Sequence, residues 1–174
     1  LFGGTDYAEM PGGQWLENPN NRRAAISPVR GQGLLRFEGD CVVREHIDVV
    51  FPVLHGENGE DGAMQGLLQL AGIPYVGPHV SASAVSMDKT LTKLVADKAG
   101  VPQAAWHLVR RADLDSRMEQ TLDALEARFP YPMFVKPSGT GSSVGVSKAA
   151  NREALAQALT AAAVYDEKIL VEEF

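Results

Sequence analysis

The residues best suited to chemistry lie between two apolar runs, Met133–Val135 and Val144–Val146. Lys136 and a proline follow the first run, and then comes a loop of glycine, serine and threonine, residues 138–143. The glycines leave backbone N–H groups open to close approach, and hydroxyl groups, beginning with that of Ser138, add further donors. With the charge of Lys136 at its mouth, this strand–loop–strand pattern predicts a polyphosphate-binding site. It lacks the Gly-Lys-Ser/Thr of a Walker A loop and the GxGxxG spacing, and a plain Gly/Ser β-hairpin turn is the alternative.

A second group of reactive side chains follows the apolar run Ile47–Leu54. Such a run is typical of a strand buried on both faces, as in a parallel sheet. Residues 64–71 then carry apolar side chains at helical spacing, with Asp61 as a candidate N-cap. His55 and Glu60 therefore lie between a strand and a helix, where open α/β sheets place their ligands. Taken singly, a turn histidine and a solvated acid are the simpler interpretations, but their shared location favours a site.

Lys89 begins a predicted helix over residues 89–99, which Gly100 ends. A cation at a helix N-terminus lies next to the positive end of the helix dipole. Lys89 is therefore either solvated or close to a bound anion. The apolar face predicted for this helix consists of Leu91, Leu94, Val95 and Ala99.

The remaining elements alternate between strands and helices. Short strands are expected at residues 14–16, 24–26, 33–37, 73–76, 104–109, 132–136 and 168–174, and helices at 81–85, 118–129 and 151–162. The last strand carries the acid pair Glu172 and Glu173, for which an edge strand with its acids facing water is the simpler interpretation. This order predicts an α/β protein with a domain boundary near residues 77–87.

The composition excludes several classes of protein. The 174 residues suit one large domain or two small ones, and the 45% hydrophobic share is ordinary for a globular protein. The net charge of −6 argues against nucleic-acid binding, and no apolar stretch approaches the roughly 18 residues of a membrane helix. Cys41 stands alone, so we expect a reducing compartment. Both ends read as parts of strands, which predicts a fragment.

Five motifs, in family order and with family-like spacing, resemble the D-alanine–D-alanine ligases of the ATP-grasp superfamily. They are Phe51–Gly62, Met87–Lys89 followed by Thr92-Lys93, Phe134–Pro137, Gly141–Val146 and Val171–Glu173. The resemblance covers residues 47–174 and implies an α/β fold. A partial Rossmann-like (pre-ATP-grasp) domain, residues 1–85, would precede the central α+β subdomain of an ATP-grasp domain, residues 86–174. Residues 13–16 and 25–28 also resemble segments of the vancomycin-resistance ligases.

The resemblance implies a nucleotide site. Lys89 and Lys136 would bind the ATP phosphates, and the phosphates would be the anion that Lys89 needs. The residues expected around the adenine are Phe134, Glu172, Glu173 and Phe174, the last three on a hinge strand that reads the base largely through its backbone.

The resemblance also implies an amino-acid site covered by a mobile loop. Gly141, Ser142 and Ser143 would lie on the loop that closes over the phosphates, and Ser142 would also help to hold the substrate. His55 would contact the reacting carboxylate, and Glu60 would lie near the first substrate.

The activity implied is ATP-dependent joining of two D-alanines through an acyl phosphate, for peptidoglycan precursors. The Mg²⁺ ligands are expected outside this chain, so no metal ligand is named and the chain alone is expected to be inactive. A cytoplasmic protein is implied, with small-molecule substrates, no nucleic-acid or membrane partner, and a homodimer at full length. Two alternatives stay open: D-Ala–D-Ser or D-Ala–D-Lac ligation, and a nucleotide-binding module without ligase activity.

Overall fold

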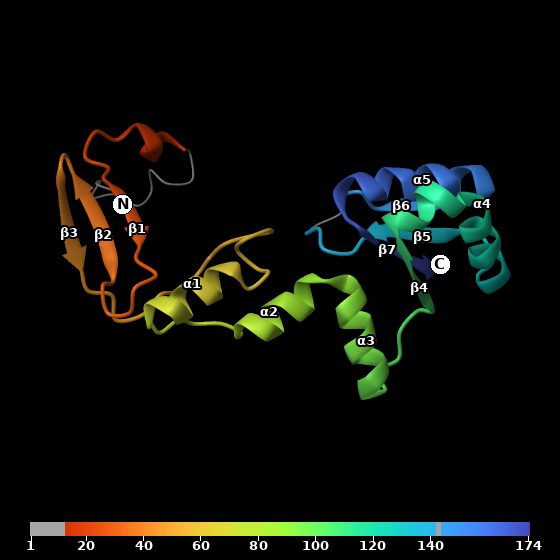
Figure 1. The fold of residues 1–174 in the computed structure, drawn as a ribbon, viewed down its shortest axis with the longest axis horizontal. Helices are drawn as coiled ribbons and strands as arrows, with labels where there is room; N and C mark the ends of the chain where they lie inside the picture. Colours follow the sequence, from red (N-terminus) through yellow and green to blue (C-terminus); the bar gives the residue numbers. More distant parts are fainter. Residues whose placement is uncertain (1–12, 142–143) are drawn as a thin grey trace. The chain divides into compact units, whose positions relative to one another are not determined.

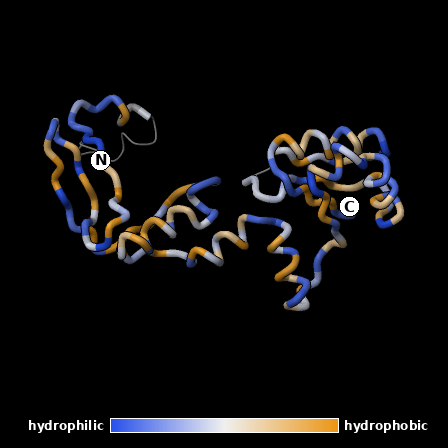
Figure 2. The backbone as a smooth tube through the Cα atoms, in the orientation of Figure 1, coloured by the Kyte–Doolittle hydropathy of each residue, from blue (hydrophilic) through white to orange (hydrophobic). Residues whose placement is uncertain are grey.

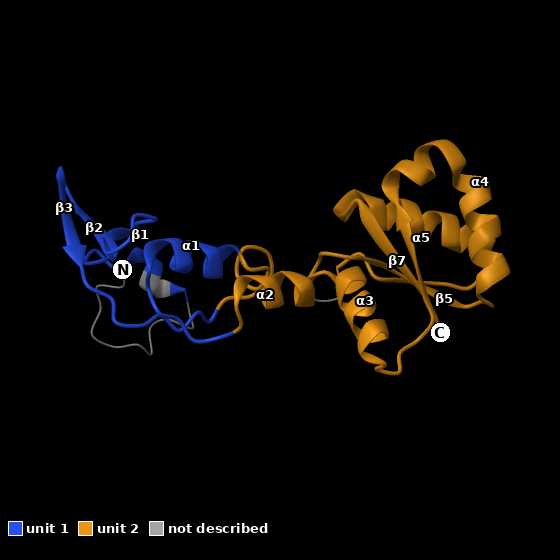
Figure 3. Cartoon of the chain, turned by 60° about the horizontal axis from the view of Figure 1, so that its bottom comes forward, with its two compact units in different colours: residues 1–53, 63–77 blue, residues 54–62, 78–174 orange. Residues whose placement is uncertain are grey.

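The computed structural model describes residues 13–141 and 144–174, which fall into two compact units (Figure 3). The described part of the first unit comprises residues 13–53 and 63–77. The second unit contains residues 54–62 and 78–174. Each unit has its own buried apolar cluster, so each is described by itself.

The first unit contains a three-stranded antiparallel sheet in the order β1-β2-β3. Its described elements are the 3₁₀ helix η2 (Gln14–Glu17), β1 (Arg23–Ile26), β2 (Leu34–Glu38), β3 (Cys41–Glu45) and α1 (Ala63–Ala71). A tight turn joins β2 to β3, with Gly39 at a positive φ of 58°. Leu68, Ala71 and Ile73 form the buried cluster of this unit.

Several strand predictions for the first unit are wrong. Residues 14–16 lie in a 3₁₀ helix, and β3 was not predicted. The run Ile47–Leu54 does not form a strand. Within the described residues, its β pairing is limited to one isolated parallel bridge, from Val50 to Tyr75. Strands of a parallel sheet are buried because helices cover both of its faces, whereas Phe51 and Val53 of this run are exposed.

The second unit is built on a four-stranded antiparallel sheet in the order β4-β7-β5-β6 (Figure 1). The strands are β4 (Trp106–Arg110), β5 (Met133–Pro137), β6 (Ser147–Ala149) and β7 (Lys168–Glu173). Two helices, α4 (Arg111–Arg128) and α5 (Arg152–Tyr165), pack on one face. The cluster between that face and the helices includes Leu122, Leu125, Met133, Val135, Leu155, Leu159, Ile169 and Val171.

Capping residues define the ends of two helices in the second unit, α3 and α5. The Asp88 side chain caps α3 (Lys89–Ala99), and Gly100 ends it in a left-handed conformation with φ 70°. The Asn151 side chain accepts a hydrogen bond from the N–H of Ala154 at the start of α5. The eight-residue helix α2 (Val80–Met87) precedes α3.

Three predictions for the second unit are corrected. The strand expected at Val144–Val146 begins later, at Ser147, because Gly145 takes a positive φ of 72° in a turn. Strand β7 is central rather than at the edge. The predicted apolar face of α3 is not buried: Leu94 and Val95 are 51% and 55% exposed. Hydrophobic positions nevertheless recur along this helix (Figure 2).

The domain boundaries 1–85 and 86–174 stay a prediction. Among the described residues, no helix combines the length and the apolar character needed to cross a membrane.

Candidate nucleotide site

The alternation of strand residues separates a core face from a free face of the four-stranded sheet. Met133 and Val135 of β5 point into the helix-covered core, so the alternate residues Phe134 and Lys136 point to the other face. Glu172 of β7 pairs directly with Phe134 and belongs to the same face. Helix α3 contacts β7, and its side chains reach this group.

Glu172 lies buried between two lysines. Its carboxylate is 2.5 Å from the ammonium of Lys93 on α3 and also pairs with Lys136 on β5. Burial opposes ionisation, but the two lysines outweigh it and hold the pKa of Glu172 below its usual value. The interpretation of this acid as a water-facing edge residue is therefore wrong. Lys93, four residues after Lys89, was missed as a functional candidate.

Lys89 turns back from the start of α3 to the glycine loop. Its Nζ donates to the backbone oxygens of Pro137, Ser138 and Thr140, at 3.1, 3.4 and 2.5 Å. Burial and the nearby charge of Lys136 lower the pKa of Lys89. Two ammonium groups close enough to repel one another beside a glycine loop form an anion-binding arrangement.

Carboxylate and hydroxyl groups position the described part of the glycine loop. The N–H of Gly139 donates to Asp166 Oδ2 at 2.5 Å, and the hydroxyl of Thr140 donates to the carbonyl of Val144 at 3.2 Å. Ser138, predicted as a ligand donor, is fully buried and bonded within the protein. Ser142 and Ser143 lie outside the described residues.

The loop at residues 54–62 approaches the glycine loop. A Cβ built on Gly141 would lie 3.6 Å from the Cα of Gly56. In the same loop, Glu60 Oε2 accepts a hydrogen bond from the N–H of Gly56 at 2.5 Å, and His55 is exposed. A pocket of about 410 Å³ lies between the loops, lined by Glu57, Asp61, Met87, Gly139, Thr140, Gly141, Val144, Tyr165 and Asp166.

Aromatic rings gather at the end of β7. The rings of Phe134 and Phe174 are 5.6 Å apart, tilted by 32°, and Lys148 Nζ lies 3.8 Å from the centroid of Phe174. Glu173 is held to the chain at Ala105 through its backbone N–H, at 3.0 Å, and through its carboxylate, at 2.7 Å. An exposed ring beside a sheet face can stack on a planar base.

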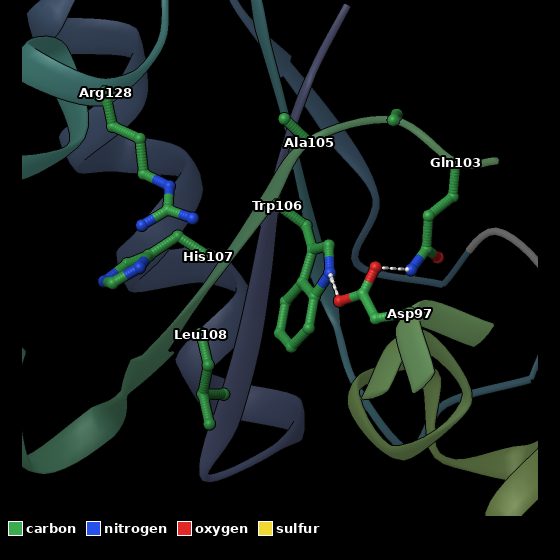
Figure 4. A pocket seen from close by; sticks show the side chains of 8 residues that line it. Asp97, Gln103, Ala105, Trp106, His107, Leu108 and Arg128 are labelled. Carbon is green, nitrogen blue, oxygen red and sulfur yellow. Dashed lines mark hydrogen bonds between the residues drawn. The ribbon is translucent and has the colours of Figure 1, made fainter. Parts of the chain in front are cut away.

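A second pocket, of about 440 Å³, surrounds the edge strand β4 and was not anticipated from the sequence (Figure 4). Trp106 donates its indole N–H to Asp97 Oδ2 at 3.0 Å, and Gln103 also bonds this carboxylate. His107 and Arg128 lie on the other side of the strand. Burial, then the charge of Arg128, lowers the pKa of His107.

Two family models together account for most of the chain. The model described as D-ala D-ala ligase N-terminus matches residues 12–78, and the one described as D-ala D-ala ligase C-terminus matches residues 95–174. The chain belongs to the D-alanine–D-alanine ligase family. The resemblance stated from the motifs is thereby confirmed.

Relatives in this family include enzymes named D-alanine–D-alanine ligase from two bacteria. That of Acetivibrio thermocellus is 58% identical over 128 residues, which are 74% of this chain and 34% of the relative. That of Deinococcus radiodurans is 47% identical over 163 residues, which are 92% of this chain and 47% of the relative. The chain thus spans a third to a half of the length of these relatives.

Solved structures of the family have the same fold. The VanG D-Ala:D-Ser ligase of Enterococcus faecalis matches 97% of this chain, and 48% of its own, with a TM-score of 0.85 and 33% identity. The D-alanine-D-alanine ligase of Coxiella burnetii matches 96% of this chain, and 47% of its own, with a TM-score of 0.78 and 33% identity. The predicted α/β fold of the ATP-grasp type is confirmed.

The family implies Mg²⁺ as well as ATP. The described residues offer groups that suit the nucleotide but no cluster of metal ligands. Lysines, loop N–H groups and aromatic rings suit a nucleotide. In the ranges 13–141 and 144–174, no three His, Cys, Asp or Glu side chains gather where they could hold a metal ion. No step is therefore assigned to Mg²⁺ on this chain.

Proposed function

We propose that this chain supplies the nucleotide-binding half of an ATP-dependent ligase that joins two D-alanines for peptidoglycan precursors. The observation that carries the proposal is the pair of ammonium groups beside the glycine loop. Lys89 reaches three of the backbone oxygens at the loop, and Lys136 lies close enough to lower the pKa of Lys89. A bound polyphosphate relieves their mutual repulsion, so both lysines favour its binding.

The chemistry proposed is a phosphoryl transfer followed by an acyl transfer. The carboxylate of the first D-alanine attacks the γ-phosphorus of ATP, and ADP leaves, which gives an acyl phosphate. The amine of the second D-alanine then attacks the acyl carbon, loses a proton, and phosphate leaves. Positioning and charge neutralisation are the main tasks of the protein in such transfers.

Each site residue is given a role within this proposal. Lys89 and Lys136 hold the phosphates, and Gly141, with Ser142 and Ser143, belongs to a lid that keeps water from the acyl phosphate. The adenine is held by the group Phe134, Glu172, Glu173 and Phe174. His55 contacts the reacting carboxylate, Glu60 lies near the first substrate, and Ser142 links the substrate to the lid.

Four further features are proposed on the family resemblance. The active protein is a homodimer, and it works in the cytoplasm, where ATP is available. Mg²⁺ is bound by residues that this chain does not contain, and the chain alone does not catalyse ligation.

D-Ala–D-Ser ligation is the second candidate. The structural match to the VanG D-Ala:D-Ser ligase, with a TM-score of 0.85, supports it. D-Ala–D-Lac ligation and nucleotide binding without turnover are the other outcomes that an experiment must separate.

The test is product analysis by mass spectrometry on a polypeptide that adds to this chain the length found in its relatives. We expect D-alanyl-D-alanine from ATP, Mg²⁺ and D-alanine, with D-serine and D-lactate as competitors. A mixed product would select the alternative specificity. Nucleotide binding without any product would overturn ligation.

Two single lysine variants of the same protein test the nucleotide site. Lys136→Ala removes a charge-assisted phosphate contact, and we expect ATP binding to weaken by about 2 kcal/mol. Lys98→Ala, at an exposed position in the last turn of α3, removes the same charge and should leave the affinity unchanged. Calorimetric titration with ATP measures both, and equal affinities for the two variants would contradict the proposal.

A further inference from the structure

The carboxylate of Asp88 joins three elements at the base of the candidate site. Its Oδ1 accepts hydrogen bonds from the N–H groups of Thr90 and Leu91, at 3.0 and 3.1 Å, and from the hydroxyl of Ser138, at 2.6 Å. Its Oδ2 pairs with the ammonium of Lys168. Helix α3, the end of β5 and the start of β7 therefore meet at one side chain.

Ser138 has no hydroxyl hydrogen left for a ligand. It is fully buried, and its one O–H proton is donated to Asp88. Its oxygen lies 2.7 Å from Thr90 Oγ1 and accepts the Thr90 N–H at 3.0 Å. The sequence indicated a phosphate donor at this position, whereas the geometry shows a buried connection between the loop and α3.

This connection determines where Lys89 lies. Lys89 stands between Asp88 and Thr90 in the chain, and its own N–H donates to the carbonyl of Ser138 at 2.9 Å. The N–H of Ser138 donates in turn to the carbonyl of Lys168 at 2.9 Å. With the backbone of Lys89 held on both sides, its ammonium is held at the loop oxygens of Pro137, Ser138 and Thr140.

We propose that Asp88 and Ser138 are positioning residues that hold the Lys89 ammonium at the phosphate site without touching the nucleotide. The proposal rests on the proposed nucleotide-binding function. A small displacement of a charged group from its productive position removes much of its contribution to binding and catalysis. Burial opposes ionisation of Asp88, but hydrogen bonds from Lys168 and Ser138 outweigh it, and its pKa is lowered. The carboxylate therefore stays charged at neutral pH.

The test is a double-mutant cycle between Ser138→Ala and Lys89→Ala, with ATP affinity measured by calorimetry. We expect Ser138→Ala alone to weaken ATP binding roughly tenfold, the loss typical of one hydrogen bond to a charged group. In the Lys89→Ala background it should weaken binding less than twofold. A similar tenfold loss in both backgrounds would show that Ser138 acts independently of Lys89 and would overturn the proposal. No loss in either background would do the same.

Further variants separate positioning from unfolding. Asp88→Asn keeps an oxygen for the α3 N-terminus but removes the charge that pairs with Lys168, and it should also weaken ATP binding and leave adenosine binding unchanged. Ser116→Ala and Asp115→Asn, both at exposed positions of α4, are the matched controls. Equal losses for ATP and adenosine would indicate general damage and would contradict the positioning role.

A measurement made without nucleotide distinguishes failure of the positioning proposal from failure of the nucleotide-binding proposal. NMR titration of the Lys89 side chain should give a higher pKa in Ser138→Ala than in the wild type, because the ammonium leaves its partly buried position. The charged groups that act on Lys89 are Lys136, Asp166, Asp88 and Glu172. A shift in a protein that fails to bind ATP would uphold positioning and overturn nucleotide binding. An unchanged pKa would overturn positioning.

Discussion

At the scale of single residues, Glu172 shows how a buried acid is kept charged inside the sheet. A buried carboxylate persists only when it is paired, and Lys93 and Lys136 provide two cations. The same pairing holds Lys136 beside Phe134, with Nζ 5.5 Å from the ring centroid. The two lysines that Glu172 pairs with therefore explain how an acid can lie in the middle of an apolar strand.

Replacing Glu172 by glutamine should destabilise the protein. The substitution leaves Lys93 and Lys136 close together without a counter-charge, and breaking a buried pair in this way costs about 3 kcal/mol. Glu167→Gln, an exposed acid just before β7, is the control and should change stability by less than about 0.5 kcal/mol. Urea unfolding at pH 7 measures both.

The pH dependence of this difference gives a second readout. The pKa of Glu172 is lower in the folded protein than in the unfolded chain. Its contribution to stability is therefore complete above the ordinary glutamate pKa and is lost as the pH falls through the lowered value. The wild type should approach Glu172→Gln in stability on acidification, and a constant difference down to acidic pH would contradict the role of its charge.

At the scale of elements, local signals predicted some helix ends and missed others: α4 begins at Arg111, seven residues before the expected start. The bounds of α3 matched the prediction because Asp88, Lys89 and Gly100 define its two ends through capping and a positive φ. Asn151 marked the start of α5 in the same way. These signals act over a few residues, so they can be recognised in the sequence without knowledge of the fold.

The pairing between distant elements could not be predicted from such local signals. The central position of β7 depends on its pairing with β4 and β5, more than thirty residues away. The ion pair between Lys93 of α3 and Glu172 of β7 joins elements far apart in the sequence, and Leu94 and Val95 beside Lys93 are exposed. Lys136 was predicted as a phosphate ligand from the residue pattern and Lys89 from the family resemblance, but the bonds that hold them come from elements distant in the sequence.

The turn between the glycine loop and β6 depends on Gly145, and Gly145→Ala tests this. A Cβ there would lie 2.6 Å from Pro137 Cγ and 2.9 Å from Tyr165 Cδ2, at a φ of +72°. Clash and backbone strain together should lower the unfolding free energy by about 2 kcal/mol or more. Thermal denaturation measures the loss.

Gly100→Ala is the matched control for this prediction. Gly100 has a similar φ of +70°, but nothing lies within 4 Å of its added Cβ. Gly100→Ala should lower the unfolding free energy only by the cost of placing alanine in a left-handed conformation, about 1 kcal/mol. Equal losses at Gly100 and Gly145 would show that packing around the turn contributes nothing.

At the scale of the whole molecule, the two units differ in how much apolar surface they bury. In the described residues, the cluster of the first unit consists of Leu68, Ala71 and Ile73. The cluster of the second unit draws on all four strands of its sheet and on both covering helices, α4 and α5. Because burial of apolar surface is the main favourable term in folding, the second unit should be the more stable.

Amide hydrogen exchange should show this difference directly. We expect backbone amides of Val135, Ile169 and Val171 to exchange on the order of 100-fold more slowly than those of β1–β3, since protection follows the free energy of local opening. Leu159→Ala, which empties a fully buried position of α5, should lower protection in β5 and β7 by about 3 kcal/mol.

Val164→Ala tests whether that loss comes from the core rather than from the helix itself. Val164 lies on the same helix but is 76% exposed, so its replacement removes almost no buried surface. Because alanine also favours the helix, protection in β5 and β7 should stay constant or rise slightly. Equal losses from Leu159→Ala and Val164→Ala would contradict the role of the cluster under α5 in sustaining the sheet that carries Lys136 and Glu172.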